Sequence, residues 1–160
     1  MTKADTAGSA GPSKPKGWNK EWNGCPVRYA AGVFGDKWSF VLLRDVLLHG
    51  KRYYGEFQRS EERISTNILA NRLAHLVETG MLTRHIDSTS RNKVFYRPTA
   101  KSRALLPAFL GVMVWSTEYD SCTEAPDSFA KAFRSDPKGT IAWYEAEIDK
   151  VDAALPDPEP

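Results

Sequence analysis

The stretch ISTNILANRLAHLVETGML, residues 64–82, carries the signals that begin and end an amphipathic helix. Ser65 can cap its start, and Gly80 can end it in a left-handed conformation. Leucines recur at the spacing of a helical core stripe, at Leu69, Leu73 and Leu76. The outward face carries small hydrogen-bonding groups where a solvated helix usually carries Lys and Glu: Ser65, Thr66, Asn67, Asn71 and His75. Such a face is suited to contact with another polar surface.

Three helical segments precede this helix. We expect a short helix over residues 26–34, a buried central helix over residues 38–50 and a helical turn over residues 55–60. With a hairpin after the helix of residues 64–82, this is the order of a winged helix-turn-helix domain, whose recognition helix enters the DNA major groove. The expected fold class is therefore α+β and mostly helical, with extra terminal helices that mediate dimerisation.

The hairpin and a long helix follow. Residues 82–87 and 93–97 have strand composition, and STSRN between them predicts the turn of a two-stranded wing. Thr99 can cap a helix that runs to Tyr119 and bends at Pro107. The apolar arc of this helix is too wide for one small core, which indicates a subunit interface.

Composition divides the 160 residues into three parts. Residues 1–23 are rich in Gly, Ser, Pro and Lys and predict a disordered tail. Residues 24–120 are expected to form the DNA-binding and dimerisation domain. Residues 121–160 are expected to form an acidic extension that contains one helix, over residues 137–155.

The net charge of +2 conceals a segregation of charge along the chain. Residues 37–103 carry 13 basic and 6 acidic side chains, whereas residues 104–160 carry 4 and 11. The local basic excess indicates a polyanionic partner such as double-stranded DNA, although a solvated basic surface would have the same composition.

Other classes of protein have little support in the sequence. Cys25 and Cys122 do not have the spacing of a disulfide framework or a zinc site, and two cysteines in this length fit the reducing cytoplasm. There is no apolar run of about 18 residues, as a membrane span requires, and no signal-peptide core. No cofactor, metal or catalytic motif stands out. We therefore expect a cytoplasmic protein that is neither an enzyme nor bound to a membrane.

From residue 25 to residue 115 the chain resembles the HxlR family of winged helix-turn-helix transcriptional regulators, relatives of the MarR-type regulators. The resemblance rests on CPV at residues 25–27, GDKWSFVLLRDVLLHGKRYYGEF at 35–57, the helix of residues 64–82, and VFYRPTAKSRALLP at 94–107. It implies a homodimer that binds an inverted-repeat operator, usually as a repressor. It also implies a frequent response to oxidants, electrophiles or small ligands.

Nine side chains are candidate DNA contacts. Asn can bond bidentately to adenine, and Ser and Thr can bond to any base or to phosphate, so four are expected on the recognition helix: Ser65, Thr66, Asn67 and Asn71. Two are expected to reach phosphate or the minor groove from the wing, Arg91 and Lys93, and three to grip phosphates from beside the central helix: Lys37, Lys51 and Arg52. The alternative for each is a cap or a solvated side chain. Arg72, near the core stripe, is expected in a structural ion pair.

Cys25 is a candidate redox sensor. It precedes Pro26 at a helix start, where unpaired N–H groups and the helix dipole stabilise a thiolate that oxidants attack. The resemblance places a sensor cysteine at this position in some members. The alternative is a small residue packed in the dimer interface.

A small effector could act instead of a thiol reagent, beside Tyr53, Tyr54, Trp38 and Trp115. The alternative function is a winged-helix protein-interaction module without sequence-specific DNA binding. Such a module would engage its partner through the acidic extension and the wide apolar helix.

Overall fold

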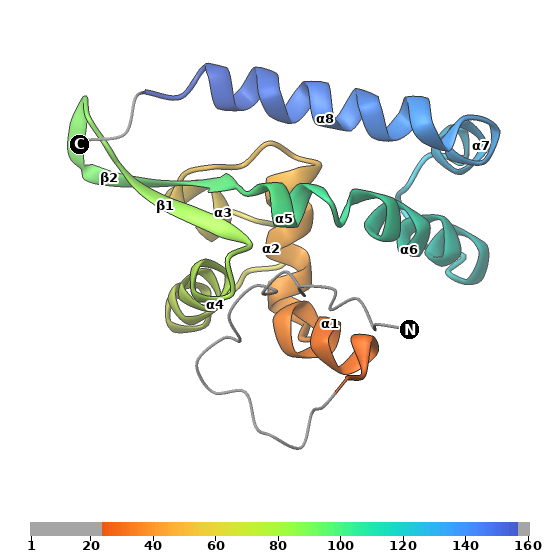
Figure 1. Ribbon diagram of the computed structural model, residues 1–160, viewed down its shortest axis with the longest axis horizontal. Coiled ribbons are helices and arrows are strands. Elements are labelled where there is room, and N and C mark those ends of the chain that lie inside the picture. Colours follow the sequence, from red (N-terminus) through yellow and green to blue (C-terminus); the bar gives the residue numbers. More distant parts are fainter. Residues whose placement is uncertain (1–23, 157–160) are drawn as a thin grey trace, which may run out of the picture.

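The computed structural model describes residues 24–156, so the expected disorder of residues 1–23 lies outside the described part of the chain. Eight helices and one antiparallel pair of strands occur within the described residues (Figure 1). In chain order they are α1 (Pro26–Phe34), α2 (Lys37–Leu47), α3 (Tyr54–Gln58), α4 (Thr66–Glu78), β1 (Leu82–Asp87), β2 (Ser90–Pro98), α5 (Ala100–Arg103), α6 (Leu106–Tyr119), α7 (Asp127–Ser135) and α8 (Pro137–Ala153). The expected mostly helical, winged helix-turn-helix fold is confirmed.

Helix α2 is the buried centre of the domain. It begins one residue earlier than expected because the Asp36 carboxylate accepts hydrogen bonds from the Trp38 and Ser39 amides, at 3.1 and 3.0 Å. It ends at Leu47, and Gly50 then turns the chain with a left-handed φ of +66°. The core-facing side chains are almost fully buried: Leu42, Leu43, Val46 and Leu47.

Helix α4 packs its leucine stripe against this core. Leu69, Leu73 and Leu76 are each buried, as their spacing predicts. Gly80 ends the helix with φ +72°, and the Met81 amide donates to the Leu76 carbonyl at 2.8 Å. The predicted glycine stop is therefore confirmed, and it directs the chain into β1.

The wing differs from the expected hairpin in its second strand. Leu82 pairs with Pro98 at the base, and β2 begins at Ser90 instead of residue 93. The turn is shorter than STSRN because the Asp87 carboxylate accepts bonds from the Thr89 amide and hydroxyl, at 2.8 and 2.6 Å. Arg91 thus lies in β2 and not in a flexible turn.

The long helix expected after Thr99 is two helices. Thr99 caps α5 through a bond from the Ser102 amide, as predicted. The helix ends at Arg103, however, and a second helix begins at Leu106. Pro107 lies in the first turn of α6, where backbone N–H groups have no partner within the helix, so its missing N–H costs no hydrogen bond. The expected bend at Pro107 is thus a break just before it.

The acidic extension is part of the folded structure. The expected last helix is present as α8, and α7 before it was not predicted. Helix α8 runs along the side of the hairpin opposite to α4 (Figure 1). Its Ile148 is 2% exposed and joins the main core cluster. No helix among residues 24–156 is long and apolar enough to span a membrane.

Candidate nucleic-acid interface

The first turns of α4 present an exposed polar surface. The four side chains expected to contact DNA from this helix are all exposed: Ser65, Thr66, Asn67 and Asn71. Ser65 occupies the N-cap position without a side-chain cap bond, so the predicted cap position is right and the predicted bond is not made. Ile68 lies among them with 38% of its surface exposed. Ile68 was not among the residues predicted to contact DNA, although its place outside the leucine stripe was a usable signal.

Two other side chains of α4 have structural partners. Nε2 of His75 lies 3.0 Å from the Val33 carbonyl oxygen, so His75 joins α4 to α1 and is not on the outward face as expected. Arg72 pairs with Asp36 at 3.3 Å, which confirms the predicted ion pair. Burial raises the pKa of Asp36, but the bond from Ser39 and the charge of Arg72 hold it below its ordinary value.

The wing presents a second polar surface. Arg91 and Lys93 are exposed and lie two residues apart on β2, which places both on one face of the strand. Tyr53 connects the wing to the start of α3. Its backbone bridges to Phe95, and its hydroxyl donates to Asp87 at 3.1 Å. The basic strand is therefore held at a fixed position beside the helix-turn-helix.

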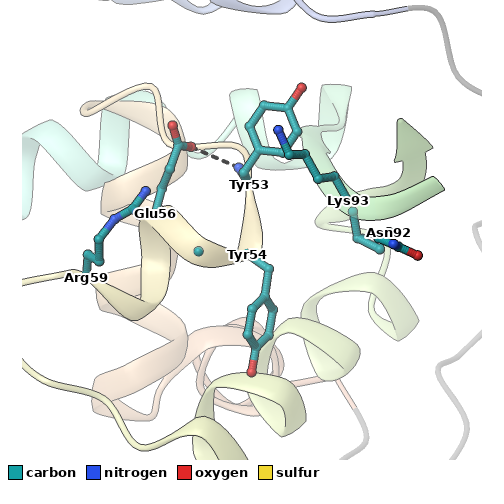
Figure 2. A pocket seen from close by; sticks show the side chains of 8 residues that line it. Tyr53, Tyr54, Glu56, Arg59, Asn92 and Lys93 are labelled. Carbon is teal, nitrogen blue, oxygen red and sulfur yellow. Dashed lines mark hydrogen bonds between the residues drawn. The ribbon is translucent and has the colours of Figure 1, made fainter. Parts of the chain in front are cut away.

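A hollow of about 480 Å³ lies between α3 and β2. Figure 2 shows Tyr54 pointing from α3 toward α4, with Arg59 and Lys93 on opposite sides of the opening. The Tyr54 hydroxyl donates to the Thr66 carbonyl at 3.3 Å, which links the hollow to the first turn of α4. Arg59 is exposed and was missed by the sequence analysis.

This hollow only partly matches the effector site expected from the sequence. Tyr53 and Tyr54 line it, but Trp38 and Trp115 do not. Trp115 is 61% exposed on α6. The four aromatic side chains therefore do not share this cavity, and the expectation that they form one site was wrong.

The three cations beside α2 have different surroundings. Lys37 is exposed, with Nζ 4.7 Å from the centre of the Trp38 ring. Lys51 donates through Nζ to Asp45 at 2.8 Å and to Ser60 at 2.7 Å. Both bonds hold Lys51 against the protein, so of these three only Lys37 lies open at the surface.

The expectation that Arg52 grips phosphate was wrong. Arg52 is 1% exposed, and its guanidinium donates to the Val46 carbonyl and to Asp152 of α8, both at 2.7 Å. Burial lowers the pKa of Arg52, and the charge of Asp152 opposes that effect. The side chain therefore fastens α8 to the domain and does not face solvent.

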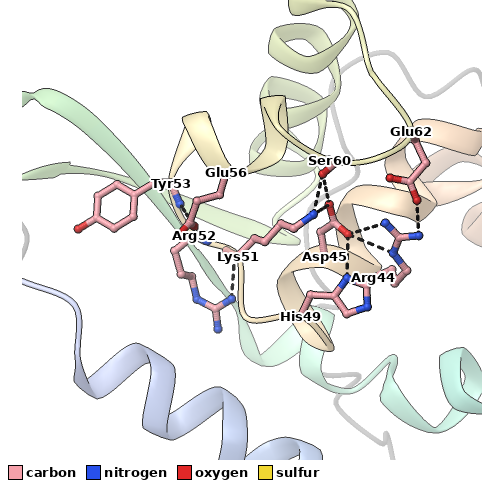
Figure 3. Close-up of polar contacts among 9 residues, drawn as sticks. All are labelled: Arg44, Asp45, His49, Lys51, Arg52, Tyr53, Glu56, Ser60 and Glu62. Atoms are coloured by element: carbon pink, nitrogen blue, oxygen red, sulfur yellow. Dashed lines mark hydrogen bonds and ion pairs between the residues drawn. The ribbon is translucent and has the colours of Figure 1, made fainter.

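Asp45 lies at the centre of the polar cluster in Figure 3. Its fully buried carboxylate pairs with Lys51 at 2.8 Å and with Arg44 at 2.6 Å, and Arg44 also bonds Glu62. Burial raises the pKa of Asp45, but hydrogen bonds from Lys51, Ser60 and Arg44 hold it below its ordinary value. The cluster joins α2 to the loop that precedes α4 and so supports the exposed polar turn.

Cys25 and an apolar surface lie on other parts of the domain. Cys25 is exposed at the N-cap position of α1, and both it and Cys122 are free thiols. The described residues contain no group of three or more side chains that could hold a metal ion.

Large exposed apolar side chains lie on α1 and α6: Val27, Tyr29, Val112, Trp115 and Tyr119.

Comparisons with known proteins agree with this arrangement. A family model for HxlR-like helix-turn-helix proteins matches residues 33–124. YdeP of Bacillus subtilis, an uncharacterised HTH-type transcriptional regulator, is 29% identical over 112 residues, which are 70% of this chain and 87% of YdeP. The reduced redox regulator HypR superposes with a TM-score of 0.55 at 28% identity, over 61% of this chain and 95% of HypR. The reduced transcriptional regulator YodB from B. subtilis gives 0.51 at 26% identity, over 62% and 98%.

Proposed function

Because this chain belongs to the family of HxlR-like helix-turn-helix transcriptional regulators, we propose that it binds an inverted-repeat operator as a homodimer and represses transcription in the cytoplasm. The observation that carries this proposal is the exposed polar turn of α4 beside a basic wing. Long charged side chains there would give affinity without discrimination, whereas short amides and hydroxyls can read base edges.

Asn67 and Asn71 are the proposed base readers. They lie four residues apart on α4 and thus on one side of it. Each good bidentate contact with adenine discriminates by about 1–3 kcal/mol. Ile68 could add apolar contact with a thymine methyl group, and Ser65 and Thr66 could contact bases or phosphate.

The proposed phosphate contacts surround the hollow between α3 and β2. Lys93 and Arg59 flank it, Arg91 lies farther along the same strand, and Lys37 is exposed at the start of α2. A DNA backbone that passes between α4 and the wing would meet these cations. Lys51 could contribute only by leaving Asp45, so we propose a lesser role for it.

The proposed dimer uses the apolar surface of α1 and α6. The Trp115 and Tyr119 rings lie with their centroids 5.4 Å apart and their planes tilted by 34°, and both are well exposed. Two subunits joined there would place their recognition helices in successive major grooves, with half-sites about one helical turn apart.

The proposed stimulus is an oxidant or electrophile that reacts with Cys25, whose thiol is exposed at the start of α1. Helix α1 belongs to the proposed dimer surface, so modification there could change the spacing of the reading helices. A small ligand in the hollow beside Tyr53 and Tyr54 is a second route.

We expect an inverted repeat when the reduced full chain selects from a random double-stranded DNA pool. Asn67→Ala with Asn71→Ala should lower preference for the repeat at least about tenfold in a folded dimer. Lys93→Ala is the matched control, because loss of one phosphate contact weakens binding to all sequences and lowers the salt slope by about 1. A pool that stays random contradicts operator binding, and unchanged preference in the double variant removes both asparagines from the reading surface.

Cys25 should be alkylated faster than Cys122, because its thiol lies at the start of a helix. Both thiols are exposed, so Cys122 is an internal control. Mass spectrometry of the full chain during limited iodoacetamide treatment gives both rates, and operator affinity should fall as Cys25 reacts. Cys25→Ser should keep binding and lose this sensitivity. Equal rates for the two thiols would contradict a sensor role.

A further inference from the structure

We infer that the groove between α7 and α8 is a binding site for a small organic cation. The groove has a volume of about 440 Å³, within the range of known small-molecule pockets. All its lining residues follow residue 124, where the match to the family ends. The site therefore belongs to the part of this chain that the family does not describe.

The walls of the groove are aromatic. Phe129 lines it from α7, and Trp143 and Tyr144 line it from α8. Trp143 is 58% exposed, and it meets Tyr144 edge to face at 4.8 Å between ring centroids. The faces of aromatic rings are electrically negative, and Trp is the strongest of them in attracting a cation.

The only charge in the lining is negative. Seven of the eight lining residues are neutral, and the eighth is Asp136 at the junction of the two helices. Its Oδ1 accepts the Gly139 amide at 2.9 Å, and a Cβ at Gly139 would lie 2.0 Å from Oδ2. Gly139 thus lets the carboxylate fold closely over the first turn of α8, which fixes its position beside the rings.

The electrostatics favour a cation over an anion or a neutral ligand. The positive end of the α8 dipole amounts to about half a charge, which the full charge of Asp136 exceeds. Three basic side chains lie nearby on α7 and α8, Lys131, Arg134 and Lys138. None of them lines the groove, and Arg134 pairs with Glu118, so Asp136 is the charge nearest a bound ligand. An anion would meet this field unfavourably, and a neutral ligand would gain nothing from it.

The site is separate from the proposed DNA surface. Helix α8 meets the rest of the domain through Ile148 and its apolar neighbours in the core, and through Asp149 and Asp152, which bond Arg103 and the buried Arg52. Binding can therefore be measured without DNA, and its failure would leave the operator proposal untouched.

The site can be tested by calorimetric titration of the full chain with two probes of the same shape. One is a cation, 3-(trimethylammonio)phenol, and the other is neutral, 3-tert-butylphenol. The cation should bind about three- to thirtyfold more tightly, the range that cation–π attraction spans. Trp143→Ala should weaken cation binding about tenfold.

Asp136→Asn separates charge from structure, because Asn caps a helix as well as Asp does. It should weaken cation binding about threefold or more and leave the neutral probe unchanged. Glu145→Gln is the matched control, since it removes one charge from the outside of α8, away from the lining. Equal affinity for the two probes, no saturable cation binding, or equal effects of Asp136→Asn and Glu145→Gln would overturn the inference.

Discussion

Asp45 combines complete burial with two cationic neighbours, Arg44 and Lys51, and its Oδ1 lies 3.3 Å from Nδ1 of His49. Its pKa in the folded protein lies below the ordinary value of 3.8, as does that of Asp36, and the pKa of Glu62 lies below 4.5. A carboxyl with a lowered folded pKa stabilises the fold above its unfolded pKa and loses that contribution as pH falls through the folded value. The free energy of unfolding should therefore decrease below about pH 4.

Asp45→Asn should lower the free energy of unfolding at pH 7 by about 2–3 kcal/mol, because charged hydrogen bonds from Lys51 and Arg44 are lost. It should also flatten the decrease in stability between pH 4 and pH 3. Urea unfolding at a series of pH values measures both effects. Asp149→Asn is the control at an exposed carboxylate and should cost less than about 1 kcal/mol. An equal pH dependence in wild type and Asp45→Asn would contradict the assigned role.

Helix α8 is held by the buried Arg52–Asp152 pair and by two more exposed pairs, from Arg103 to Asp149 and to Asp152. The buried pair should contribute most to its attachment. Asp152→Ala leaves the Arg52 guanidinium buried without its counter-ion, which should cost about 3–5 kcal/mol of stability. Arg52→Met in the same chain removes the stranded charge and should restore much of the loss. Thermal unfolding of the two single variants and the double variant measures this coupling. Additive losses would show that the pair does not hold α8.

At the level of elements, the sequence predicted those helices and helix ends that depend on interactions between residues close together in the chain. The leucine spacing and Gly80 predicted α4 and its end, because both signals lie within one helix. Helix α7 is nine residues long with two phenylalanines as its apolar signal, too little to predict it. The shorter turn of the wing depends on bonds from Thr89 to Asp87, which strand composition does not reveal.

In the candidate site, too, residues placed by local periodicity were predicted, and residues placed by distant partners were not. Helical periodicity predicted five outward-facing side chains at α4; four are exposed, and the fifth, His75, instead contacts Val33 of α1. Arg52 was assigned to the surface because its partner, Asp152, lies 100 residues away in the sequence. The groove between α7 and α8 depends on a helix that the sequence did not predict, so nothing local pointed to it.

At the scale of the whole molecule, the proposed dimer predicts a sharp effect at Trp115. Trp115→Glu places a carboxylate in an apolar interface and should raise the dimer dissociation constant at least about thirtyfold. Sedimentation velocity across a concentration series measures the change. Trp143→Glu is the control, because Trp143 is similarly exposed but lies on α8. A dimer that tolerates Trp115→Glu would exclude this surface as its interface.

Burial of Arg52 under α8 couples two regions that could otherwise change independently in evolution. The family match ends at residue 124, yet a charged residue inside the matched region has its counter-ion at residue 152. A lineage that lost α8 would lose this pair and the packing of Ile148, and would expose the core surface that α8 covers. Each further substitution that adapts the domain to α8 increases the stability that the protein would lose if α8 were removed. A minimal DNA-binding fragment of this chain should therefore extend through α8 and not stop at the family boundary.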